Sequence, residues 1–186
     1  MTYFNTREMA AIALFAALWG VLASFVAPIV FRATGLPILC DVVGFAILIL
    51  AVWWIRKFGA VALVGITATI VNFIFNPGGF HFLGFTAASI IFDVIARMIG
   101  YRRSFKNPLS IVISMLFLSV FSAAIAGFII GMFFTEASLL AKRGGVLGWV
   151  GLHAFGGVIG GLVGIILVTA LVSRGFKRSG GSECQR

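Results

Sequence analysis

The sequence predicts an all-α, polytopic membrane protein in which six transmembrane helices form one bundle, with both termini in the cytoplasm. Three observations predict it: the apolar composition, the spacing of long apolar runs, and the distribution of basic residues. Of the 186 residues, 61% are hydrophobic and 10% are charged, whereas a soluble domain has roughly 45–50% apolar and about 25% charged residues. So much apolar surface does not fit inside one small water-soluble core. The composition therefore excludes a soluble enzyme, a disordered chain and a disulfide-stapled secreted domain.

Six apolar runs reach or approach the length of about 20 residues that a helix needs to cross the hydrocarbon core. Turn-forming and charged residues separate these runs. The second and third runs are short and are divided only by Arg56 and Lys57, so one long, broken hairpin is the alternative for that part. We expect a six-helix transmembrane domain over residues 1–173 and a disordered cytoplasmic tail over residues 174–186. The six runs are Met9–Phe31, Ile38–Ile55, Phe58–Phe75, Phe80–Ile99, Pro108–Phe134 and Val146–Val172.

Basic residues predict the orientation of the bundle. Six crossings place both termini and the second and fourth connections on one side of the membrane, and that side holds 11 of the 14 basic residues. The other side holds only Arg32, Lys142 and Arg143. Since Lys and Arg accumulate in cytoplasmic loops, both termini are predicted to be cytoplasmic. The net charge of +9 is thereby attributed to topology, and no nucleic-acid partner is expected.

Small residues recur at four-residue intervals in three of the runs, a pattern that lets membrane helices approach one another closely. In the fifth and sixth runs we expect these residues to pack inside the bundle; they are Ser119, Ala123, Gly127 and Gly131, then Gly156, Gly160 and Gly164 with Gly157 and Gly161 beside them. The first run has two helix faces with small residues, one with Ala13 and Ala17 and the other with Ala16 and Gly20. One neighbouring helix does not require two such faces, so these four residues are predicted to dock another membrane subunit; the alternative is close packing inside the bundle.

The scarce polar residues near the outer ends of the helices are the candidate substrate-binding residues. Polar groups within membrane spans are costly and need a partner or a purpose. Phenylalanines surround them in sequence, and an aromatic wall with a few polar anchors is typical of a small-molecule site. The alternative interpretation is solvated helix ends for Asp41, Asn76 and Glu136, an interfacial belt residue for Trp149, and a loop cap for His81. The candidates are Asp41, Asn72, Asn76, His81, Glu136, Trp149 and His153.

No pattern of catalytic residues is present, so the chain is not expected to be an enzyme. The sequence contains neither a His-Glu-x-x-His motif, nor Gly-x-Ser-x-Gly, nor a phosphate-binding loop. Uphill transport would therefore take its energy from a partner or an ion gradient. Near the inner end of the fourth run, Asp93 and Arg97 lie four residues apart and are predicted to form a structural ion pair. The alternative is a contact with a cytoplasmic partner.

The six spans, cytoplasmic termini, short chain and alanine-rich first helix together resemble the substrate-binding S component of energy-coupling factor (ECF) vitamin transporters. The resemblance covers nearly the whole chain as an architecture, and its local motif is Ala-x-x-x-Ala, matched by Ala13 and Ala17. It implies a multi-pass protein of a prokaryotic plasma membrane whose first helix contacts a membrane-embedded T component. Two ATPase subunits use ATP, and the S component itself carries no cofactor. The loops at 32–37, 76–79 and 135–145 would form and close an outward-facing pocket.

The ligand is less defined than the architecture. Asp41 and Glu136 favour a cationic or amine-bearing solute, and the aromatic residues favour a flat ring, as in a thiamine- or pyrimidine-related compound. The alternative hypothesis is that the ligand is a transition-metal ion, held by His81, His153, Asp41 and Glu136. The metal-binding branch of the family has its ligands at the extreme N-terminus, where this chain has no histidine.

The alternative function is a stand-alone secondary transporter or channel for a small solute or metal ion. An accessory protein without a ligand and an intramembrane enzyme are the remaining hypotheses.

Overall fold

The computed structural model describes residues 3–176, and every regular element in this part of the chain is a helix. The all-α prediction is confirmed, and the six long helices match the predicted runs to within three residues at each end. The two short helices lie in connections. The predicted tail lies outside the described residues from residue 177 onwards. The helices are α1 (Thr6–Thr34), α2 (Ile38–Ile55), α3 (Ala60–Phe75), α4 (Phe82–Ile99), α5 (Tyr101–Ser104), α6 (Pro108–Phe133), α7 (Ala137–Lys142) and α8 (Gly145–Ser173).

Five of these helices, α1, α2, α4, α6 and α8, are long and apolar enough to cross a membrane. The helix α3 is also apolar but has only 16 residues. Large apolar side chains cover the outside of the bundle; Ile29, Ile74, Phe117, Leu147 and Ile166 are each more than half exposed. Water-soluble proteins rarely expose such continuous apolar surface. The chain therefore has the helices and the surface of a multi-pass membrane protein.

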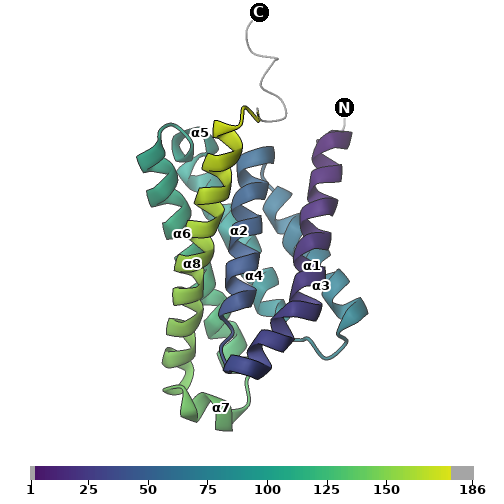
Figure 1. Ribbon diagram of the computed structural model, residues 1–186, viewed down its shortest axis with the longest axis vertical. Helices are drawn as coiled ribbons and strands as arrows, with labels where there is room; N and C mark the ends of the chain where they lie inside the picture. The colour runs from purple at the N-terminus through teal and green to yellow at the C-terminus, as the bar shows by residue number, and fades with distance from the viewer. Residues whose placement is uncertain (1–2, 177–186) are drawn as a thin grey trace, which may run out of the picture.

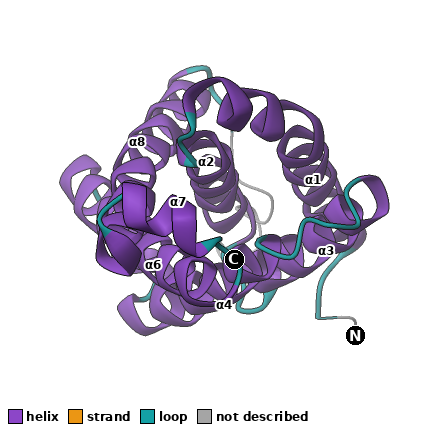
Figure 2. Ribbon diagram, turned by 90° about the horizontal axis from the view of Figure 1, so that it is seen from below, coloured by secondary structure: helices purple, strands orange, loops and turns teal. Residues whose placement is uncertain are grey.

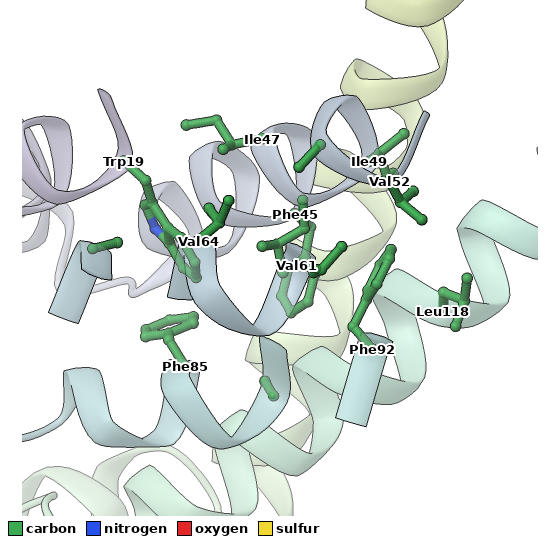
Figure 3. Close-up of a cluster of buried hydrophobic side chains, with 14 of the residues drawn as sticks. Trp19, Phe45, Ile47, Ile49, Val52, Val61, Val64, Phe85, Phe92 and Leu118 are labelled. Atoms are coloured by element: carbon green, nitrogen blue, oxygen red, sulfur yellow. The ribbon is translucent and has the colours of Figure 1, made fainter. Parts of the chain in front are cut away.

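The helix α2 lies at the centre of the bundle. Around it, α1, α3, α4, α6 and α8 follow one another, each contacting the next, and α2 contacts all five (Figure 2). Accordingly, 61% of the apolar window of α2 is buried, against 28–44% in the other four long helices. Trp19, Phe45, Val64 and Phe85 bring side chains from four helices together in the core beside α2 (Figure 3).

Glycines set the close approach of α8 to its two neighbours, as the sequence predicts. A Cβ atom on Gly160 would lie 2.7 Å from the backbone oxygen of Asp41 in α2. On the adjacent face of α8, a Cβ atom on Gly157 would lie 2.8 Å from the backbone oxygen of Ser119 in α6. These distances leave no room for a side chain, so the small residues of the fifth and sixth predicted runs are used inside the bundle.

Local sequence signals explain where the helices begin and end. The helix α1 begins with a capping box, in which the Asn5 side chain accepts from the Glu8 N–H and the Glu8 carboxylate accepts from the Asn5 N–H. It ends at Gly35, whose φ of 66° is left-handed. Before that end, α1 contains Pro28, which cannot donate a helical hydrogen bond and favours a bend. The last turns of α1 swing across the end of the bundle (Figures 1 and 2).

The predicted ion pair between Asp93 and Arg97 is wrong. The buried Asp93 carboxylate accepts hydrogen bonds from the Ala62 N–H (3.1 Å) and the Tyr101 hydroxyl (3.3 Å). Asp93 thus caps the N-terminal turn of α3, where the helix dipole favours a negative charge. Arg97 is exposed instead, with its guanidinium 5.7 Å from the centre of the Phe58 ring. Spacing along one helix could not reveal that a second helix begins beside the carboxylate.

Candidate functional site

A cavity of about 270 Å³ lies at the end of the bundle near α7. Figure 1 shows that α7 is at the opposite end from the start of α1 and the end of α8. Its walls come from the last turns of α1, the start of α2, the start of α4, the end of α6, α7 and the start of α8. The volume lies just below the range of about 300–1,000 Å³ that is common for ligand pockets. The space therefore suits a small organic molecule.

Five of the seven predicted substrate-binding residues line this cavity, namely Asn76, His81, Glu136, Trp149 and His153. They come from segments far apart in sequence, because the connections after α1, α3 and α6 all reach the same end of the bundle. The other lining residues are mostly apolar or aromatic, so the cavity has an aromatic wall with a few polar groups. They are Ala23, Ala27, Pro28, Phe31, Leu36, Pro37, Leu39, Cys40, Phe85, Ile130, Phe134, Thr135 and Leu139.

The other two predicted residues do not line the cavity. Asp41 is fully buried behind His153, whose Nδ1 lies 3.0 Å from each of the two carboxylate oxygens of Asp41. Asn72 is buried between α3 and α1, where its Nδ2 donates to the Ser24 hydroxyl at 3.0 Å. The sequence places both residues near this end of the bundle, but only the packing shows that one supports a cavity residue and the other joins two helices.

The Asp41–His153 pair joins the central helix to α8 beside the cavity, which His153 lines. Glycines make the room for it: a Cβ atom on Gly156 would lie 2.7 Å from the Asp41 Cβ, and one on Gly127 would lie 2.8 Å from the His153 Cβ. The pair is almost completely buried, with side-chain exposures of 0% for Asp41 and 1% for His153. A buried charged group is stable only when it is paired or neutralised. The orientation of the His153 ring is therefore held by Asp41.

Two ring nitrogens in the cavity wall have no hydrogen-bond partner among the described residues. They are Nε2 of His153 and Nε1 of Trp149, both buried. The two rings lie edge to face with their centres 5.7 Å apart, and the Phe85 ring centre lies 5.8 Å from that of His153. Buried polar groups are almost always paired in a folded protein, and the two side chains that carry these unpartnered atoms line the cavity, where a small molecule or an ordered water could pair with them.

His81 directly precedes α4 and lines the same cavity. Burial lowers the pKa of His81, and the nearby His153 lowers it further. His81 is therefore favoured as a neutral imidazole, which has one donor and one acceptor nitrogen. His81 thus lies in the connection between α3 and α4, and its side chain lines the cavity.

Two polar interactions involve the connections at the cavity end of the bundle. The Arg143 guanidinium, just after α7, donates to the Gly35 carbonyl oxygen at 3.0 Å. Glu136 is exposed, and its carboxylate accepts from the Ser138 hydroxyl at 2.9 Å. The contact made by Arg143 ties the connection after α7 to the connection after α1. Sequence reasoning did not single out Arg143, nor the cavity residues Phe31, Phe134 and Cys40; Pro28 in an apolar run was the available signal that α1 bends over this end.

The predicted docking residues on α1 divide into two groups. Ala13 and Ala17 are exposed on the outside of the bundle. Ala16 is fully buried, and a Cβ atom on Gly20 would lie 2.7 Å from the Val71 side chain in α3. Gly20 therefore brings α1 against α3, and Ala16 lies in the core of the bundle. Neither residue is part of an open docking surface, which corrects that half of the prediction.

Within residues 3–176, no group of three or more His, Cys, Asp and Glu side chains is placed to hold a metal ion. His81 and His153 share the cavity, but Asp41 faces only the buried side of His153 and Glu136 is exposed. The four residues that were predicted to hold a transition-metal ion are thus not gathered around one point. Comparison of the chain with protein-family models, curated proteins and solved structures finds no match.

Proposed function

We propose that this protein is the substrate-capture (S) subunit of an ECF-type importer, which binds a small vitamin-like solute in the cavity near α7. The observation that carries the proposal is an aromatic cavity at one end of a membrane bundle, with two buried, unpartnered ring nitrogens in its wall. A pocket with few polar groups among aromatic ones is the usual form of a small-molecule site. A flat, pyrimidine-related ring is of a suitable size for a cavity of about 270 Å³.

The proposal includes six crossings and an outward-facing cavity. The helix α3 spans about 24 Å at 1.5 Å per residue, and it connects the end of α2 to the start of α4. The cavity end carries Arg32, Lys142 and Arg143, and the other 11 basic residues of the sequence belong to the opposite side in a six-span arrangement. The excess of basic residues opposite the cavity supports a cytoplasmic position for the termini in a prokaryotic plasma membrane.

The proposed partners are a membrane-embedded T component and two ATPase subunits. The support is the exposed Ala13 and Ala17 on α1, where small residues allow another membrane helix to approach closely. ATP would be used only by the partner subunits. The T component would contact the lipid-facing side of α1 and leave the cavity free.

A tryptophan substitution tests this division between docking and capture. Replacing Ala13 or Ala17 with Trp should abolish uptake and co-purification of an identified T component and its ATPases, because the indole prevents close helix approach. Solute retained by the purified protein, measured by native mass spectrometry, should be unchanged. Ile166→Trp on the exposed face of α8 is the matched control, since Ile166 is 64% exposed and lies on a different helix.

Three results would contradict the proposal in different ways. Equal loss of retained solute and of uptake in the Ala13 variant would exclude a separate docking surface. Uptake by the purified chain alone in liposomes, driven by an ion gradient, would favour a stand-alone carrier. Absence of any retained small molecule from the wild-type chain would exclude solute capture.

A further inference from the structure

We infer that the cavity selects a small planar solute that carries hydrogen-bond acceptors, such as ring or amide carbonyl oxygens, on its buried edge, and that it does not select an ammonium group. This inference rests on the proposed capture function and names the chemical class of the captured solute. It departs from the amine-bearing ligand that the acidic residues predict, because the structure puts Asp41 behind His153 and out of the cavity wall.

The first step is the protonation of the Asp41–His153 pair. Both side chains are almost completely buried, and within residues 3–176 Asp41 has no ion pair with a lysine or arginine. A net charge on such a pair is costly, because water no longer solvates it. Two neutral arrangements satisfy the contact: an imidazolium with a carboxylate, or a neutral imidazole that accepts the proton of a carboxylic acid at Nδ1. A third, in which Nδ1–H donates to a carboxylic acid, would leave the acid O–H buried without an acceptor, because Asp41 Oδ2 has no other partner among the described residues. In the two favoured arrangements, Nε2 of His153 carries a hydrogen.

The second step is the geometry of the donors. An Nε2–H group on His153 and the Nε1–H group of Trp149 are both buried in the cavity wall, and both lack a partner among the described residues. The two residues lie four apart on α8, so their side chains share one face of that helix. An indole N–H only donates. Two side chains that line the cavity therefore carry unpartnered donors, and a solute that pairs with them must supply acceptors.

The third step is the absence of a counter-charge. None of the described lining residues is a lysine or arginine, so a carboxylate in the cavity would have no fully charged partner except the already paired His153. The one acidic lining residue, Glu136, is exposed, and a hydrated carboxylate gives little selectivity for a buried ammonium. Phe31, Phe85 and Phe134 complete the wall. A neutral, flat molecule with carbonyl acceptors matches this set of groups better than either ion.

A direct test is the ¹⁵N NMR spectrum of the histidines in the full chain, reconstituted in lipid nanodiscs. The sequence contains only two histidines, so His81→Asn assigns the His153 signals by elimination. The ¹⁵N chemical shift separates a protonated ring nitrogen from a bare one. We expect a protonated Nε2 on His153, and a bare Nε2 would overturn the inference whether or not a solute is captured.

A second measurement uses two probes with the same ring, nicotinamide and 3-(aminomethyl)pyridine, and follows their binding by saturation-transfer NMR titration. Nicotinamide should bind and the amine should not. Trp149→Phe should weaken nicotinamide binding about three- to tenfold, the effect of one lost hydrogen bond. Trp19→Phe is the matched control, because the Trp19 indole N–H is also buried without a partner but lies outside the cavity wall.

The outcomes separate the two proposals. Tighter binding of 3-(aminomethyl)pyridine, or equal weakening by Trp149→Phe and Trp19→Phe, would overturn the acceptor inference and leave solute capture in place. Binding of neither probe, although native mass spectrometry finds a retained solute, would also overturn the inference alone. Failure to find any retained solute would refute the capture function, and the acceptor inference with it.

Discussion

Replacing Gly160 with Ala should destabilise the bundle, although alanine is the better helix former. The added Cβ atom would lie 2.7 Å from the Asp41 carbonyl oxygen and 3.0 Å from the Val42 Cα. Both atoms belong to the backbone of α2, so the clash is relieved only by moving the two helices apart. Such a shift would also strain the Asp41–His153 pair, which joins the same two helices.

The magnitude follows from two opposing effects. Overpacking against backbone atoms, which cannot rotate aside, falls in the upper part of the usual range, about 2–3 kcal/mol, and replacing a helical glycine with alanine returns about 1 kcal/mol. The net loss of about 1–2 kcal/mol corresponds to a fall in melting temperature of about 2–8 °C for a chain of this length. The measurement is thermal unfolding of the purified protein in nanodiscs.

Two other glycines of α8 are matched controls for this effect. A Cβ atom on Gly151 would meet nothing within 4 Å, so Gly151→Ala should leave the melting temperature unchanged or raise it. A Cβ atom on Gly161 would meet side-chain atoms of Ser119 and Leu116, which can move, so Gly161→Ala should fall between the other two. Equal melting temperatures for Gly160→Ala and Gly151→Ala would refute the assignment of the α2–α8 contact.

Two further predictions concern the two ends of the bundle. The pKa of His81 is lowered in the folded protein from its ordinary value of 6.5, so the unfolded chain takes up the proton first as the pH falls. Stability should therefore decrease as the pH drops below about 6.5. His81→Asn should make the melting temperature depend less on pH in this range. At the other end, Asp93→Ala should lower the melting temperature more than Tyr101→Phe does, because Tyr101→Phe loses only one hydrogen bond worth about 1 kcal/mol. Asp93→Asn keeps an acceptor for the Ala62 N–H and should lower the melting temperature less than Asp93→Ala. An Asp93→Ala variant as stable as Tyr101→Phe would contradict the capping role.

Periodicity and composition were sufficient to locate the helices but not to predict which helices contact one another. The predicted runs located all six long helices, because apolar length and intervening turn residues are local properties of the chain. The four small residues of α1 show the limit of this reasoning. Their spacing marks two faces, but whether a face is buried inside the bundle, as at Ala16 and Gly20, or exposed on its outside, as at Ala13 and Ala17, depends on which helices are adjacent.

The candidate site shows the same division. Charge counting and helix direction were enough to place Asn76, His81, Glu136, Trp149 and His153 at one end of the chain's bundle, and all five line the cavity. Nothing in their spacing indicated that Nδ1 of His153 would be engaged by Asp41.

The amino-acid sequence by itself determined that this chain forms apolar helices, where each begins and ends, and which residues lie at each end of a helix. These properties follow from local hydrophobicity, capping and turn chemistry. Only the tertiary structure decided that α2 occupies the centre, that Asp41 is engaged by His153, and that two ring nitrogens remain unpartnered in a cavity under the bent end of α1. Such contacts join residues more than 100 positions apart, and they depend on how closely glycines let the helices approach, which no local pattern specifies.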